Sequence, residues 1–250
     1  MKDLQGLQGL VGKGQRQFDL GDLKKPGQFA PVPNANAFYR SEGGADPASL
    51  KPYNRQDRFA IYQHYKKDVD RVDSGGAPSQ ELTRSYDALR SAIPGQADRA
   101  SKAVKPVIDA NYYANSPYPD AQTMSKEMGS KGSFRVAPTT PEESTVAWDA
   151  STNDKFRGLH DTLAHGGAGS TFSYDGESLG TEAHRSTLPQ EAHRALTAEV
   201  LGQATHHEFG GGFVDQKGLY DVPDWAAKGE ARPTPKLSPK QFEGTQGTLF

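Results

Sequence analysis

The sequence contains no cysteine, so disulfide bonds, thiol catalysis and thiolate metal ligands are excluded. A disulfide-stabilised secreted domain is disfavoured for the same reason. The chain has no apolar run near the roughly 18 residues that a membrane-spanning helix needs. Residues 1–20 also lack the apolar core of a secretory signal. We therefore expect a protein with no transmembrane segment that is not secreted and works inside a cell or a larger assembly.

Neither sign of charge is in large excess. The 29 basic and 31 acidic residues leave a formal net charge of -2, and no long run of one sign occurs. A broad nucleic-acid footprint needs clustered Lys and Arg. The sequence therefore carries no strong nucleic-acid signal, and its charges are typical of a solvated surface.

Apolar residues are scarce, at 34% of the chain with a mean hydropathy of -0.77. Residues 1–52 and 224–250 are the poorest in apolar periodicity and are rich in Gly or Pro. Such segments bury too little surface to offset the entropy of ordering them. We predict an extended arm over residues 1–52 and an extended tail over 224–250, both held by partners, around a domain over residues 53–223.

Apolar residues at helical spacing predict that this domain is mainly α-helical with little β structure. One helix is expected from Asn54 to Val72. A second follows Ser79 and ends at Pro94-Gly95, and a third covers residues 96–114. Beyond them, residues 120–128 suggest a short helix and residues 134–136 a short strand.

Histidines are concentrated in one part of the chain, because six of the seven lie between His160 and His207. A helix capped by Asn153 or Asp154 is expected to run into His165, where a glycine-rich stretch ends it. His160 and His165 are five residues apart, which is about 140° around an α-helix. Two such imidazoles converge if the second lies at the helix end, and this pair predicts part of a metal site.

A pair of imidazoles leaves such a site incomplete. Zinc usually takes a third protein ligand, and non-haem iron takes two histidines and one carboxylate. Glu199 lies beside the apolar side of a helix expected over residues 189–207. A carboxylate there is costly to bury unless it is paired or binds a metal. We therefore predict Glu199 as the third ligand of a divalent metal, with Fe(II) favoured over Zn.

Three further residues are candidates for catalysis beside this metal: Asp161, His184 and Gln203. His184 is expected on a helix over residues 176–186, which also carries Glu177. The alternative is a buried polar network that joins the helices and does no chemistry, since such networks also use His and carboxylate partners.

The metal-site residues resemble the iron site of the aromatic amino acid hydroxylases. That family has an H-[ED]-x-x-G-H pattern and later a T-x-E-x-G segment; here the corresponding blocks are His160–His165 and Thr197–Gly202. The resemblance implies His160, His165 and Glu199 as iron ligands. The sequence departs from the pattern in three ways: Ala164 replaces the glycine, Gly202 is shifted by one position, and no pterin-binding segment is recognisable.

Four blocks between residues 154 and 223 resemble an uncharacterised domain of bacteriophage and mobile-element proteins. The blocks read F-R-x-x-H-D-x-x-x-H, E-x-x-x-x-x-H, T-x-E-x-x-G-Q and F-x-D-Q-K-x-x-L in that domain; here they begin at Phe156, Glu177, Thr197 and Phe213. The resemblance implies a phage accessory or virion-associated protein, in the virion or the host cytoplasm, whose arms bind other virion or phage-encoded proteins.

Two kinds of activity are open for such a protein. With Fe(II), open coordination positions would take dioxygen and substrate. With zinc, a bound water of lowered pKa would hydrolyse an ester or amide. The alternative from a different class is a purely structural head or tail component, whose arms lie along neighbouring subunits and which has no catalytic activity.

The last five residues, Gln246–Phe250, read Q-G-T-L-F. They resemble the short Q-x-x-L-F peptide that docks on bacterial sliding clamps. The resemblance implies a sliding clamp as a further partner. An apolar anchor for assembly is the alternative role.

Overall fold

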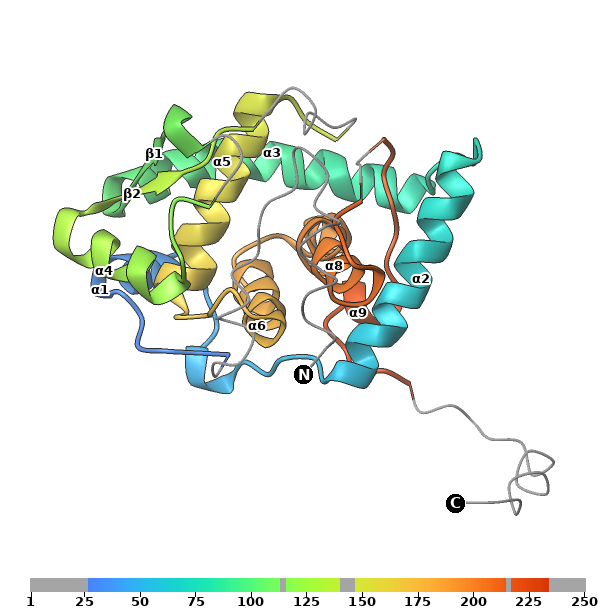
Figure 1. The fold of residues 1–250 in the computed structure, drawn as a ribbon, viewed down its shortest axis with the longest axis horizontal. Coiled ribbons are helices and arrows are strands. Elements are labelled where there is room, and N and C mark those ends of the chain that lie inside the picture. Colours follow the sequence, from blue (N-terminus) through green and yellow to red (C-terminus); the bar gives the residue numbers. More distant parts are fainter. Residues whose placement is uncertain (1–26, 113–115, 140–146, 215–216, 234–250) are drawn as a thin grey trace, which may run out of the picture.

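The computed structural model describes residues 27–112, 116–139, 147–214 and 217–233 (Figure 1). Within these ranges the fold is mainly α-helical with little β structure, as the sequence predicted. The α-helices are α1 (Pro33–Ser41), α2 (Arg55–Asp73), α3 (Gln80–Ala103), α4 (Ala121–Lys131), α5 (Ala150–His160), α6 (Tyr174–Arg185), α7 (His193–Thr197), α8 (Gln203–Gly210) and α9 (Asp224–Ala227). None of these helices is long and apolar enough to cross a membrane.

Other elements connect the α-helices. Two π-helical turns, η6 (Asp161–Gly167) and η8 (Ala198–Gly202), continue α5 and α7. Strands β1 (Lys105–Ile108) and β2 (Ser133–Val136) form a parallel pair in which Lys105 lies opposite Ser133. Short 3-10 turns cover Pro47–Ser49, Ala110–Tyr112 and Gln190–Ala192.

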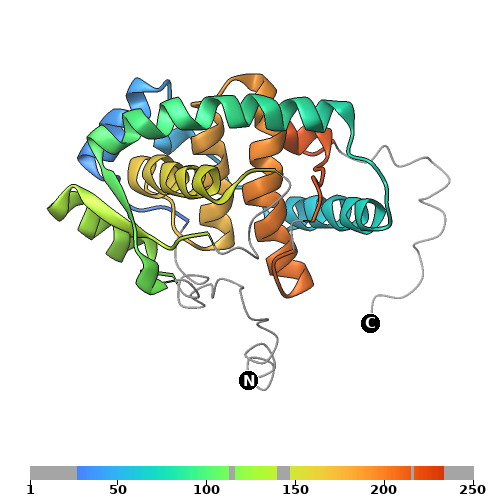
Figure 2. The same cartoon turned by 90° about the horizontal axis from the view of Figure 1, so that it is seen from above.

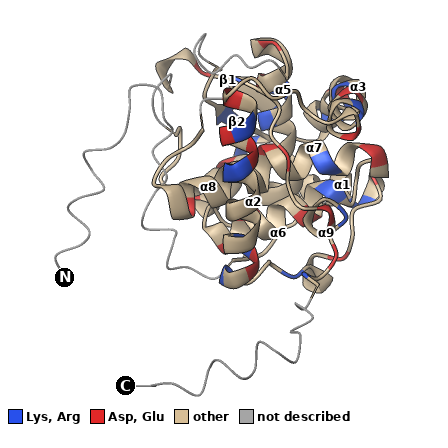
Figure 3. Cartoon of the chain, turned by 90° about the vertical axis from the view of Figure 1, so that its right-hand side faces the viewer, with Lys and Arg blue, Asp and Glu red and all other residues tan. Residues whose placement is uncertain are grey.

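The long helix α3 crosses the other helices on one side of the molecule (Figures 1 and 2). It packs against α5 and α7, and the largest core cluster lies between them. That cluster contains Leu82, Tyr86, Leu89, Ile93, Trp148, Phe156, Leu188 and Leu196. Lys and Arg are interspersed with Asp and Glu on the side shown in Figure 3.

The prediction of two helices over residues 79–114 is wrong, because a single helix, α3, covers most of this range. It passes through Pro94 and ends at Ala103, and residues 105–108 form β1 in place of the expected third helix. A proline inside a helix removes one hydrogen bond and usually ends or kinks it. Here Ile93 and Ala100, on either side of the proline, are both buried, so packing maintains the helix across it.

The predicted N-terminal arm is wrong for its second half. Helix α1 buries Ala35 and Tyr39 completely. The Val32 N–H donates to the Gly166 carbonyl at 2.8 Å. Residues 27–52 therefore belong to the domain, although too few apolar residues occur there for a periodic pattern. Residues 1–26 lie outside the described ranges.

The predicted C-terminal tail also begins too early. Ala226 and Ala227 of α9 are buried in a cluster with Tyr53 and Tyr65, so the domain extends past the predicted boundary at residue 223. The sliding-clamp-like segment Gln246–Phe250 lies outside the described residues.

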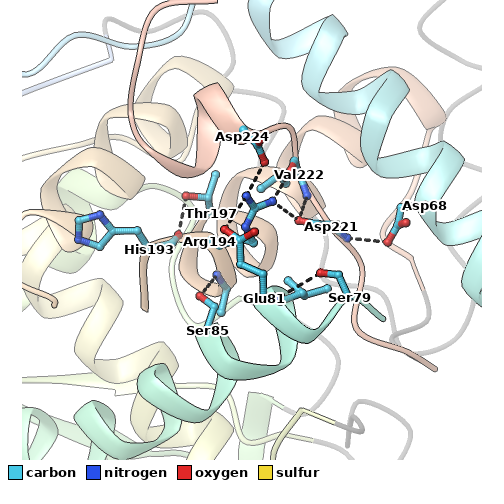
Figure 4. Close-up of polar contacts among 12 residues, drawn as sticks. Asp68, Ser79, Glu81, Ser85, His193, Arg194, Thr197, Asp221, Val222 and Asp224 are labelled. Carbon is cyan, nitrogen blue, oxygen red and sulfur yellow. Dashed lines mark hydrogen bonds and ion pairs between the residues drawn. The ribbon is translucent and has the colours of Figure 1, made fainter. Parts of the chain in front are cut away.

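Arg194 of α7 connects α3, α7 and α9 (Figure 4). Its guanidinium lies 2.8 Å from Asp221, 2.5 Å from Asp224 and 3.0 Å from Glu81. The Arg194 side chain is only 8% exposed, whereas Glu81 and Asp224 are mostly exposed. Ion pairs of this kind hold the helix that leads into η8.

Candidate metal centre

His160 and His165 lie at the junction of α5 and η6. Asp149 caps the N-terminus of α5, and its carboxylate accepts from the Thr152 N–H at 2.7 Å. The helix then continues without a break into η6, where Ala168 N–H donates to the Leu163 carbonyl five residues back at 2.9 Å. A π-helix pairs residues i and i+5, so the five-residue spacing brings the two imidazoles to the same side. Their ring centroids are 5.2 Å apart.

A carboxylate from α6 completes the cluster. Among the described residues, His160, His165 and Glu177 offer ligand atoms that all lie within 4.8 Å of one another. Ser173 caps the N-terminus of α6, and its hydroxyl accepts from the Gly176 N–H at 3.1 Å. This puts Glu177 in the first turn, where the helix dipole favours a negative charge.

Close approach of α6 to η6 requires a glycine. A Cβ atom at Gly180 would come within 3.0 Å of Ala164 Cβ and Ser170 Oγ, and 3.6 Å from His160 Cε1. Gly180 lies one turn after Glu177 on α6. Its small size therefore brings the carboxylate within reach of both histidines.

The distances indicate that the three side chains can share one ion. His160 Nε2 lies 3.6 Å from Glu177 Oε2, and His165 Nε2 lies 3.7 Å from Glu177 Oε1. Both separations exceed the roughly 2.7–3.2 Å of a direct hydrogen bond. Ligand atoms that each lie about 2.1 Å from one ion are about 3.0–3.4 Å apart. The two imidazole–carboxylate separations exceed this range by only a few tenths of an ångström, and all three ligand atoms lie within 4.8 Å of one another.

The tautomer of His165 suits metal binding. Its Nδ1 lies 2.9 Å from the Ser170 carbonyl and 3.0 Å from the Ser170 hydroxyl. Because a carbonyl only accepts, Nδ1 carries the proton. Nε2 is then the basic nitrogen, and it is the one that lies near Glu177. A second hydrogen-bonded partner of this kind typically orients metal-binding imidazoles.

His184, one of the three catalytic candidates, lies next to His160. The two Nδ1 atoms are 3.3 Å apart, and the Phe156 ring stacks on His184. Burial lowers the pKa of His184 well below its usual value, and the neighbouring His160 lowers it further. A neutral His184 can accept at Nδ1 from the His160 Nδ1–H, which leaves His160 Nε2 as the ligand.

The other two catalytic candidates lie in different places. Asp161 Oδ1 is 4.0 Å from His165 Nε2 and its side chain is 20% exposed, so it lies at the solvent side of the cluster. Gln203 begins α8, and its Oε1 accepts from the Val214 N–H at 3.2 Å. Gln203 thus anchors the segment after α8.

The prediction that Glu199 supplies the third ligand is wrong in its geometry. Glu199 is not part of the His160–His165–Glu177 cluster; its Oε1 accepts from the Tyr86 hydroxyl at 2.5 Å. A carboxylate among apolar residues needs a partner, and Glu199 has one. The partner is a buried phenol on α3.

A signal for Glu177 was present in the sequence. Glu177 and His184 are seven residues apart on the helix expected over 176–186, which is two turns and therefore one face. They also form one of the four blocks that resemble the phage domain. The hydroxylase-like spacing favoured Glu199, because spacing along the chain contains no information on how the helices pack.

Comparison of the chain with protein-family models, curated proteins and solved structures gave no match. Inferences about function therefore rest on the residues and on the geometry of the site.

Proposed function

We propose that the protein binds one divalent transition-metal ion through His160 Nε2, His165 Nε2 and a carboxylate oxygen of Glu177. The observation that supports this most strongly is the placement of both basic nitrogens 3.6–3.7 Å from different oxygens of one carboxylate. The histidines are buried, with 7% and 2% of their surface exposed. Two histidines and one carboxylate on one side of an ion are typical of non-haem Fe(II) sites, so Fe(II) is favoured over Zn.

The remaining coordination positions would face the side of Asp161 and Glu177, which are the most exposed groups of the cluster. With iron, the site would carry out oxygenase-like chemistry; with zinc, it would activate a water molecule for hydrolysis. In either case Asp161 is suited to accept a proton from a molecule bound there. His184 would keep His160 in the required tautomer.

Metal titration tests this proposal. The purified protein is stripped with a chelator and titrated with Fe(II) without oxygen, and separately with Zn(II). We expect one ion per chain, and less than a tenth of that occupancy in His160→Ala and in His165→Ala. His193→Ala is the matched control. His193 is a partly buried histidine of the same region of the sequence, but its Nε2–H donates to the Leu188 carbonyl. Folded protein that binds neither metal would contradict the proposal.

The resemblance to a phage domain supports a further part of the proposal, namely that this is a phage accessory or virion-associated protein. It rests on the four sequence blocks alone. Mass spectrometry of phage particles purified from a host that produces the protein tests this part of the proposal. Absence of the protein from the particles would contradict the virion-associated role and leave only the accessory role.

A further inference from the structure

A buried phenol and a carboxylate form a close pair on the α3 side of the core. Tyr86 is 2% exposed, and its hydroxyl donates to Glu199 Oε1 at 2.5 Å. That length is typical of a strong hydrogen bond to a carboxylate, about 2.5–2.7 Å. Burial and the charge of Glu199 both raise the pKa of Tyr86 well above its usual value, so the resting phenol keeps its proton. A phenol loses an electron most readily when a base takes its proton in the same step.

Aromatic rings connect this pair to the metal centre. The Tyr86 and Trp148 ring centroids are 5.9 Å apart, and those of Trp148 and Phe156 are 4.9 Å apart. Phe156 lies 6.4 Å from His160 and stacks on His184 at 5.7 Å. Each separation falls within the range of direct ring contact, about 4.5–7 Å. Trp148 and Phe156 are both buried, so solvent does not interrupt the path.

We infer that Tyr86 is a redox-active tyrosine that gives one electron to the His160–His165–Glu177 centre through Trp148 and Phe156, while Glu199 accepts its proton. The inference rests on the proposed function, with iron as the metal. It assigns Glu199 a role that differs from the metal ligation predicted from the sequence. It also gives a reason for a tryptophan to lie between the tyrosine and the site, because indole is the side chain most easily oxidised after phenol.

The step balances with a peroxide as the oxidant. Hydrogen peroxide takes two electrons and two protons to form two water molecules. Tyr86 would supply one electron and become a neutral phenoxyl radical, and an Fe(II) ion held by His160, His165 and Glu177 would supply the other by oxidation to Fe(III). The phenolic proton moves to the Glu199 carboxylate, and two protons come from solvent.

Electron paramagnetic resonance after rapid freezing tests the inference. The Fe(II)-loaded full chain is mixed with one equivalent of hydrogen peroxide and frozen at successive times. We expect an organic radical signal that narrows when the protein is made with ring-deuterated tyrosine. Tyr86→Phe should remove at least about nine-tenths of it. Trp148→Phe should slow its appearance at least about tenfold, because it removes the relay and leaves the phenol in place.

Two further variants serve as controls. Glu199→Gln keeps the size of the side chain and removes the base, so the signal should fall even if Tyr86→Phe fails to fold. Tyr39→Phe should leave the signal unchanged, since Tyr39 is fully buried and its hydroxyl lies 3.2 Å from the Ser186 hydroxyl, which is not a carboxylate base. A signal that persists in both Tyr86→Phe and Glu199→Gln, or an iron-loaded protein that gives no organic radical, would overturn the inference. Protein that binds no iron would overturn the proposed function and this inference together.

Discussion

The two π-helical turns in the described part of the chain have similar backbones but carry different side chains. His160, the last residue of α5, and His165 of η6 are five residues apart, so the turn brings two imidazoles to one side. In η8 the residue five positions after Glu199 is Ala204, which offers no ligand. Both turns follow a regular helix and both are largely buried. A π-turn could therefore contribute to the proposed metal site only where the sequence supplies a ligand at each end of its five-residue step.

The turns also differ in what packs on them. Helix α1 contacts η6 closely, and the Asn36 amide donates to the Gly167 carbonyl at 2.7 Å. Helix α6 approaches η6 from another side and brings Glu177. By contrast, η8 packs against α2, where a Cβ atom at Gly202 would come within 2.5 Å of the Tyr65 ring. The carboxylate of η8, that of Glu199, faces Tyr86 on α3. The partner helix, and not the turn itself, decides whether a carboxylate meets histidines or a phenol.

The largest effect on stability is expected from the loss of Arg194, whose ion pairs hold the helix that leads into η8. Arg194→Ala leaves Asp221 without its ion pair, and removing one partner of a mostly buried pair costs about 3 kcal/mol. Denaturant unfolding measures the change. Glu81→Gln is the control and should cost less than about 1 kcal/mol, since Glu81 is 67% exposed. Folded Arg194→Ala should still bind metal fully, because η6 is held by other contacts; lost binding would mean that the two turns are coupled.

A second substitution tests the packing of η6. Gly167→Ala adds a Cβ atom 2.8 Å from Tyr39 Cβ and 3.2 Å from the Ala35 carbonyl. Overpacking of this kind costs about 1–3 kcal/mol. We expect metal affinity to fall as well, because α1 and η6 must separate. Gly202→Ala is the matched change in η8 and should destabilise the fold while metal affinity stays the same. Equal loss of affinity in both would contradict the separation of the two turns.

His184 should affect the metal through His160 without binding it. Replacing a group that orients a ligand typically lowers metal affinity about 10–100-fold. We therefore expect His184→Phe to weaken binding by that factor while it retains one ion per chain at saturation. Competition with a chromogenic chelator measures the affinity. Complete loss of binding would indicate that His184 is itself a ligand.

The smallest effect concerns the pH dependence of the ion pair between Arg194 and Asp224. The hydrogen bond and charge of Arg194 hold the pKa of Asp224 below its usual 3.8. A lowered carboxyl pKa stabilises the fold above the unfolded-state value, and this contribution is lost as the pH falls through the folded-state value. Because Asp224 is 75% exposed, Asp224→Asn should cost less than about 1 kcal/mol at pH 7. The difference should vanish well below pH 3.8; a constant difference would contradict this account.

Much of the fold was predictable from local signals. The 3.6-residue period of α2 and the first half of α3, the cap at Ser79 and the break after Ser74 all follow from side-chain chemistry. The path of α3 through Pro94 was not predictable, because buried neighbours on both sides outweigh the lost hydrogen bond. Helix α1 was missed since it has only a few apolar residues, of which Ala35, Phe38 and Tyr39 are buried.

The candidate site was half predictable. The histidine pair could be identified from spacing, and the structure brings the two rings together. The reason it does so, a π-turn in place of an α-helical end, has no clear sequence signature beyond the spacing itself. The carboxylate was assigned to Glu199 because a buried charge needs a partner. Which partner it meets depends on the packing of α3 and α6, which residue spacing does not specify.

The most direct test of the central claim compares the two carboxylates. Glu177→Gln and Glu199→Gln are prepared as full chains, and Fe(II) binding is measured by anaerobic titration with elemental analysis of the product. We predict that Glu177→Gln lowers affinity by more than about 100-fold, beyond the loss typical of an outer-shell change, while Glu199→Gln binds one ion with unchanged affinity. The opposite result, with binding lost in Glu199→Gln and kept in Glu177→Gln, would contradict the site described here.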